Sequence, residues 1–100
     1  MDDSRHISER LRALADPARR QVVELLSDGA RRAGELASLA GVAPATMSRH
    51  LKVLLAAGIV DDERSVTDAR VRLFFLQREA LAPVGEWVQG VLASGRRSVG

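Results

Sequence analysis

Two short helical patterns that meet at a glycine constrain this chain more than any other feature. The first, GELASLA, carries Leu36 and Leu39 on its apolar side and ends at Gly41. The second begins at Pro44, whose ring is preformed for the first turn of a helix, and runs through Ala57 before a second glycine. Two helices joined by about three residues that include a glycine predict a helix-turn-helix motif.

Helical patterns also precede this motif. Apolar residues recur at helical spacing near the start of the chain, at Ile7, Leu11 and Leu14. They predict a first helix over about residues 5–15. Asp16 can cap free backbone amides and Pro17 suits the first helical position, so a second helix is expected to begin here and to stop at Gly29.

The pattern changes to strand after the helix-turn-helix. IVDDERSV (59–66) and VRLFFL (71–76) flank the polar turn TDAR, which predicts an antiparallel hairpin. A last helix is expected over about residues 83–94, with Pro83 at its start. The fold class is therefore mostly α with one small β-hairpin.

Length and composition fit one soluble unit. The 100 residues are 46% hydrophobic and show no internal repeat or linker, so we expect a single domain over residues 1–100. The opening MDDSRHISER lacks the apolar segment of a secretory signal, and no apolar run approaches the ~20 residues that span a bilayer. We expect a cytoplasmic protein without a membrane partner. A formal net charge of +2 neither requires nor excludes a nucleic-acid partner.

The helix expected over 44–57 has two different faces. Met47, Leu51 and Leu54 follow i, i+4, i+7 spacing and should point inward. The opposite side carries small, hydroxyl and basic residues, namely Ala45, Ser48, Arg49 and Lys52, with Thr46 and His50 flanking them. Such a face suits the major groove of double-stranded DNA, because arginine bonds guanine in a bidentate manner, serine serves as donor or acceptor, and alanine leaves room.

Four stretches together resemble the ArsR-type bacterial winged-helix repressors. They are LADPARRQVVELL, GELASLAGV, MSRHLKVLLAAGIV and DDERSVTDARVRLFFL, and the resemblance extends over about residues 7–92. It implies a homodimeric transcriptional repressor in which the first and last helices form the dimer interface. It further implies that the fourth helix reads the operator and that the hairpin, or wing, lies along the phosphate backbone.

The resemblance also suggests residue roles. Ser48 and Arg49 match the family's base-contacting positions, with Ala45, Thr46 and His50 beside them, and Lys52 one turn later should reach phosphate. The wing contributes Arg64, Arg70 and Arg72, accompanied by Asp61, Asp62, Glu63 and Asp68. The dimer interface should comprise Ile7, Leu11, Leu14, Val84, Trp87, Val88 and Val91.

The sequence departs from the family pattern at two places. Ala43 stands where relatives usually have a capping serine, a change that costs about 1 kcal/mol of helix stability. Leu55 and Ala56 occupy positions that are commonly charged, so one extra apolar side chain is expected to pack on another element.

We expect no metal, no cofactor and no catalytic residue. The chain has no cysteine, and metal-sensing relatives usually use cysteine pairs in the third helix or His and carboxylates in the last. His6 and His50 are the only histidines, and Glu86 is the only plausible ligand in the last helix. No nucleophile elbow or phosphate loop supports an enzyme.

Other interpretations stay open at this point. A winged helix can be a protein-interaction adaptor that never binds DNA, and steep salt dependence would distinguish the two functions. Arg19 and Arg20 are expected to pair with acids such as Glu24, while Arg31 and Arg32 are expected to be solvated. Trp87 suits core or dimer packing. The operator, any small-molecule inducer, and repression as opposed to activation are unknown from the sequence.

Overall fold

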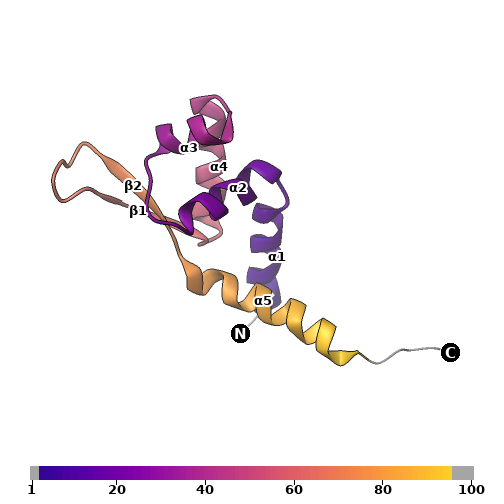
Figure 1. Ribbon diagram of the computed structural model, residues 1–100. Helices are drawn as coiled ribbons and strands as arrows, with labels where there is room; N and C mark the ends of the chain where they lie inside the picture. The colour runs from indigo at the N-terminus through magenta and orange to yellow at the C-terminus, as the bar shows by residue number, and fades with distance from the viewer. Residues whose placement is uncertain (1–2, 96–100) are drawn as a thin grey trace.

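The computed structural model describes residues 3–95 (Figure 1). Five helices and one hairpin follow each other in the order α1 (Asp3–Leu14), α2 (Pro17–Leu26), α3 (Ala33–Ala40), α4 (Pro44–Ala56), β1 (Val60–Arg64), β2 (Arg72–Leu76) and α5 (Arg78–Ser94). The predicted fold class, mostly helical with one antiparallel hairpin, is confirmed. In Figure 1 the hairpin leaves the helical body on one side and α5 leaves it on another.

The end of α2 and the start of α5 differ most from the sequence prediction. α2 ends at Leu26 rather than at Gly29, because the backbone amides of Asp28 and Gly29 donate only three residues back, to Leu25 and Leu26, while the Ser27 hydroxyl donates to the Glu24 carbonyl at 2.6 Å. A serine that bonds the preceding turn competes with the continuing helix.

The start of α5 was predicted wrongly. The helix begins at Arg78, so Pro83 lies inside it rather than at its start. The first turn is held from outside the helix, since Ala80 is buried in the core and Leu81 packs against it. Tertiary packing therefore allows α5 to begin before Pro83, although proline usually stands in the first turn of a helix.

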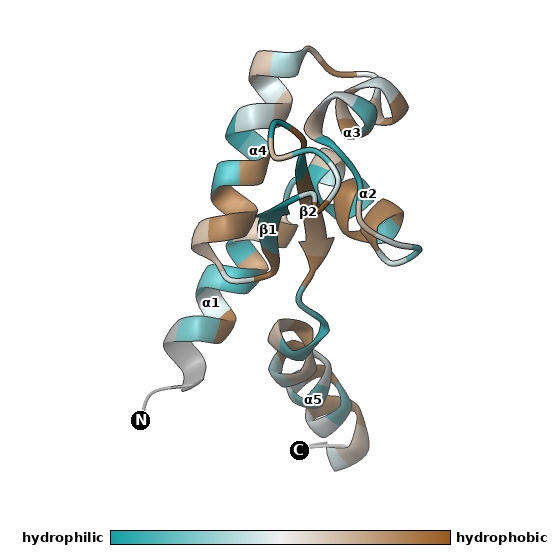
Figure 2. Ribbon diagram, turned by 90° about the vertical axis from the view of Figure 1, so that its left-hand side faces the viewer, coloured by the Kyte–Doolittle hydropathy of each residue, from teal (hydrophilic) through white to brown (hydrophobic). Residues whose placement is uncertain are grey.

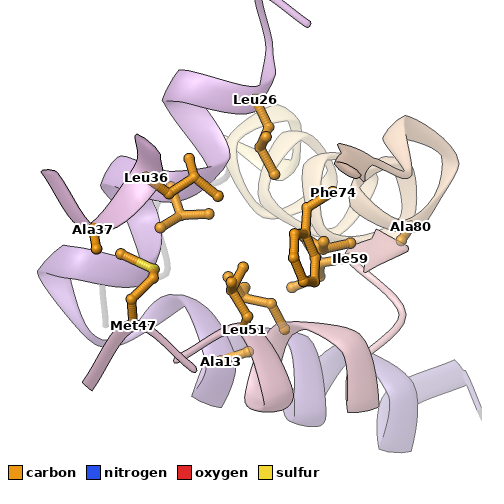
Figure 3. Close-up of a cluster of buried hydrophobic side chains, with 12 residues drawn as sticks. Ala13, Leu26, Leu36, Ala37, Met47, Leu51, Ile59, Phe74 and Ala80 are labelled. Atoms are coloured by element: carbon orange, nitrogen blue, oxygen red, sulfur yellow. The ribbon is translucent and has the colours of Figure 1, made fainter. Parts of the chain in front are cut away.

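The core lies between the helix-turn-helix and the base of the hairpin (Figure 3). Met47, Leu51 and Leu54 of α4 are 0%, 2% and 0% exposed, so the predicted inward stripe is confirmed. They meet side chains from the other elements, namely Ala13, Val22, Leu26, Leu36, Ala37, Ile59, Val60, Phe74 and Ala80. All buried residues of this cluster are apolar, so the hydrophobic effect holds α4 against the rest of the body.

The hairpin is anchored at its base by a third backbone segment. β1 and β2 pair antiparallel, from Val60 opposite Leu76 to Arg64 opposite Arg72. On the free edge of β2, Phe74 exchanges two backbone hydrogen bonds with Arg31, at 3.0 and 2.8 Å. The loop before α3 therefore covers a strand edge that would otherwise be unpaired.

The predicted exposure of the two arginines in this loop is half right. Arg32 is exposed, but Arg31 is half-buried and bonds Glu35 at 2.7 Å and the Leu25 carbonyl at 3.3 Å. The prediction that Arg31 is solvated was wrong because the residue that bonds its backbone, Phe74 of β2, is distant in the sequence.

Candidate nucleic-acid interface

α4 is well terminated at one end only. At its C-terminus Gly58 adopts φ 76°, its amide donates to Leu55, and the amide of Ile59 donates to Leu54, which together close the helix in a Schellman motif. At its N-terminus Ala43 is the cap residue and makes no side-chain cap bond. The expected missing cap is confirmed, so the Ala43 side chain satisfies none of the free amides of the first turn.

The outward face of α4 matches the prediction residue by residue. Ala45, Ser48, Arg49 and Lys52 are exposed, whereas Thr46 and His50 at its flanks are half-buried. Val53 is also exposed, at 39%, and sequence analysis did not single it out.

A hollow of about 280 Å³ lies between α4 and the hairpin. Ser48 and Lys52 line it from α4, and Arg72 lines it from β2. Leu55 forms part of its wall and packs against the core, which confirms that the extra apolar residue of α4 contacts other elements. The fold thus brings two predicted α4 residues beside one predicted wing residue.

The arginines of the wing, defined here as residues 60–76, all have partners within the wing. Arg70 bonds both carboxylate oxygens of Asp68, at 3.2 and 3.4 Å. Bonds donated by the Arg70 side chain and then by its backbone amide lower the pKa of Asp68. Arg72 pairs with Asp62, and Arg64 donates to the Ala69 carbonyl at 3.2 Å. The acids identified in the sequence therefore partly neutralise this segment.

The corner between α1 and α2 begins with the predicted cap. The Ala18 amide donates to the Asp16 side chain at 2.8 Å, and this bond is the main reason that the pKa of Asp16 lies below its usual value. The Asp16 and Pro17 start signal for α2 is confirmed.

The predicted pairing of Arg19 and Arg20 with Glu24 is wrong. Arg20 donates to the carbonyls of Leu14 and Ala15, at 2.8 and 3.0 Å. Arg19 likewise donates to carbonyls at the end of α1. These carbonyls lack partners within α1 and attract both guanidinium groups more effectively than a solvated acid on the same helix.

The two outer helices expose an unusual amount of apolar surface. Trp87 is 53% exposed, so it does not belong to the core of one chain. Other large side chains on these helices are also exposed, namely Leu11, Val88, Val91 and Leu92, whereas Ile7, Leu14 and Val84 are half-buried. Figure 2 shows hydrophobic segments recurring along α5 outside the body of the fold. Leu92 was not in the predicted interface.

The overall dimensions agree with this uncovered surface. The radius of gyration is 16.0 Å, whereas a compact domain of this length has about 13 Å. The longest extent, 60 Å, is more than twice either of the others. α1 and α5 contact each other, but much of α5 has no neighbour within the described chain (Figure 1).

The described residues carry neither a grouped set of metal ligands nor a membrane-spanning helix. Between residues 3 and 95 no three His, Asp or Glu side chains are grouped in a way that would hold a metal ion. Across that span no helix combines the length and hydropathy needed to cross a bilayer.

A helix-turn-helix followed by a hairpin and flanked by outer helices defines the winged helix-turn-helix class. A model of the helix-turn-helix domain matches residues 14–63. The HTH-type transcriptional repressor SmtB of Mycobacterium tuberculosis is 43% identical over 65 residues, which are 65% of this chain and 48% of that protein. The HTH-type transcriptional regulator CmtR of Mycobacterium bovis is 35% identical over 82 residues, which are 82% of this chain and 68% of that protein.

The structural comparison agrees. The crystal structure of an ArsR family transcriptional regulator has a TM-score of 0.77 and 28% identity, and the match covers 94% of this chain and 96% of that one. The chain belongs to the ArsR family of winged helix-turn-helix transcriptional regulators. It is therefore grouped with regulators rather than enzymes. It spans about half the length of SmtB, one of the curated relatives it matches.

Proposed function

We propose that this protein is a homodimeric repressor that binds a pseudo-palindromic site in double-stranded DNA. The observation that carries the proposal is the two-faced α4, whose apolar side is fully buried while Ala45, Ser48, Arg49 and Lys52 face solvent. A helix held firmly on one side and bearing donors on the other can enter a major groove without losing its place in the fold. Repression is favoured because SmtB is a transcriptional repressor.

In this proposal each α4 residue has a role. Arg49 makes a bidentate bond to a guanine edge and Ser48 contacts a neighbouring base. Ala45 and Thr46 approach the bases at the start of the helix. His50 and Lys52 contact phosphate, which fixes the register of the helix without selecting sequence.

The wing has a supporting role along the DNA backbone. Arg70, at the tip, has 91% of its side chain exposed, whereas Arg72 has 50%. Arg64 and Arg72 lie closer to the body and complete the proposed phosphate contacts.

Dimerisation through α1 and α5 completes the proposed function. The exposed apolar side chains Leu11, Trp87, Val88 and Val91 support it, because a second copy would bury them. A two-fold dimer places its recognition helices about 10 bp, or a multiple of that, apart on the DNA. Sedimentation at micromolar concentration should give the mass of two chains, and a monomer would contradict the interface.

Selection of bound sequences from a random DNA pool tests the function as a whole. We expect a two-fold symmetric consensus and a steep loss of affinity with added salt. The proposal would be contradicted if no consensus sequence were recovered, or if the affinity for DNA did not change with salt concentration.

One observation favours a second candidate function. The wing arginines are paired with Asp68 and Asp62, which lowers the attraction of the wing for phosphate. A winged-helix adaptor that binds another protein would tolerate such pairing. Binding of that partner without salt-dependent DNA binding would support the adaptor.

A further inference from the structure

Arg19 joins two helices through one guanidinium group. Its Nε donates to the Ala13 carbonyl, and its Nη2 donates to the Arg12 carbonyl at 3.2 Å, both near the end of α1. Its Nη1 lies 3.3 Å from Nδ1 of His50 in α4. Because a guanidinium only donates, Arg19 is the donor and Nδ1 of His50 the acceptor of this contact. Arg19 thus connects the end of α1 to the middle of the recognition helix.

A second contact connects α1 to the C-terminal end of the same helix. Arg10 donates from Nε to the Ala57 carbonyl at 3.3 Å. Between the two polar contacts Ala13 is packed in the core at 1% exposure. A single contact leaves a helix free to pivot, whereas contacts at two separate points fix its direction relative to α1.

We propose that Arg19 is a positioning residue for DNA recognition, which acts through His50 to set the angle between α1 and α4. The inference rests on the proposed function, in which α1 forms the dimer interface and α4 enters the DNA. The two recognition helices of a dimer must reach grooves a fixed distance apart, so the angle within each protomer determines the half-site spacing that the dimer prefers.

Arg20 provides a matched control. It also donates to the end of α1, at Leu14 and Ala15, yet within the described residues its hydrogen bonds do not reach α4. Arg20→Met removes one positive charge and two bonds to α1, whereas Arg19→Met also removes the contact with His50. A difference between the two variants therefore reports the contact with α4.

The first experiment varies the spacing of the DNA half-sites. Affinity is measured for the selected operator and for versions with one or two base pairs added or removed between the half-sites. Arg19→Met should lose about tenfold on the selected spacing, the effect of one charge-assisted hydrogen bond, while binding the altered spacings nearly as well as the wild type. Arg20→Met should keep the wild-type preference. If Arg19→Met weakens every spacing alike and flattens the salt dependence by about one unit, Arg19 binds phosphate directly and the proposal is overturned.

A double-mutant cycle tests whether Arg19 acts through its contact with His50. Arg19→Met and His50→Leu should each reduce the spacing preference, and the double variant should show no greater reduction than Arg19→Met alone. Fully additive effects would show that the two side chains act separately and would contradict the proposal.

The last experiment requires no DNA. Since the chain lacks cysteine, spin labels can be placed at Ser8→Cys in α1 and Ser48→Cys in α4, and the labelled protein diluted with unlabelled protein. The distance distribution between the labels should be narrow in wild type and Arg20→Met, and broad in Arg19→Met. If Arg19→Met does not fold, His50→Leu breaks the same contact and leaves the α1 carbonyls paired. An unchanged distribution would overturn the positioning role, whereas failure of the wild type to select DNA would contradict only the proposed function.

Discussion

The guanidinium group of Arg70 holds the carboxylate of Asp68 at both oxygens, from Nε to Oδ1 at 3.2 Å and from Nη2 to Oδ2 at 3.4 Å. The Arg70 backbone amide also donates to Oδ1, at 3.0 Å. The residue proposed to contact phosphate at the wing tip therefore carries its own anionic partner. DNA must compete with Asp68 for this arginine, or bind beside it.

Arg70→Ala should weaken binding to all DNA sequences alike and flatten the plot of log affinity against log salt by about one unit, because one phosphate contact is lost. Asp68→Asn should have the opposite effect, since it removes a negative charge near the backbone and releases the guanidinium. Filter binding over a range of salt concentrations measures both. A change in base preference in Arg70→Ala would place the wing, rather than α4, against the bases.

Leu54→Ala should lower the free energy of unfolding by about 2–5 kcal/mol, because it leaves a cavity where a leucine is fully buried between α4 and the rest of the core. Leu39→Ala is the matched control at a 49% exposed position on α3 and should stay within about 0.5 kcal/mol. Urea unfolding gives both values. An equal loss of unfolding free energy in the two variants would contradict the role of the buried cluster around Leu54 in stabilising the fold.

Asp16 makes the start of α2 sensitive to acid. Its pKa is lowered mainly by the hydrogen bond from Ala18. The stability that the ionised carboxylate contributes is therefore complete when the pH lies above the unfolded-state pKa. It disappears as the pH falls through the lower folded-state pKa. Asp16→Ala should therefore melt below the wild type at neutral pH, and the difference should shrink below about pH 4. Asp28→Ala, beyond the other end of α2, should not lower the melting temperature. A gap between Asp16→Ala and wild type that persists at pH 2 would contradict the role of this carboxylate.

Stoichiometric Zn, Ni, Co, Cu or arsenite should not release the protein from its operator, and chelators and thiol reagents should be equally inert. The chain has no cysteine, and the described residues offer no cluster of three ligands. His6 and Glu86 could meet across a dimer interface, so His6→Ala and Glu86→Gln are the variants to compare. Release by one equivalent of metal per subunit would overturn this prediction.

Local patterns in the sequence were sufficient for the features that depend on neighbouring residues. The spacing of Met47, Leu51 and Leu54 determined which side of α4 is buried, because helical geometry relates these positions directly. The Asp16 cap and the closing Gly58 were found for the same reason.

Contacts between distant residues could not be predicted in this way. The bonds of Arg31 to Phe74 and of Arg19 to His50 join positions far apart in the chain, and nothing in the local sequence distinguishes these arginines from solvated ones. The start of α5 was predicted wrongly from Pro83, because no local pattern in the sequence indicates that Ala80 packs against the core. The residues of the DNA surface were predicted from the helix face and the family resemblance, and their roles stay predictions.

The most direct measurement of the central claim is the binding of Arg49→Ala to a site selected by the wild-type protein and to the same site altered at each base pair. We expect a loss of about 1–3 kcal/mol on the selected site and a relaxed preference at one base pair per half-site, with a smaller change in non-specific binding. The free energy of unfolding should change by less than about 0.5 kcal/mol, because Arg49 is exposed. Unchanged base preference at every position would contradict the assignment of α4 as the helix that reads the DNA.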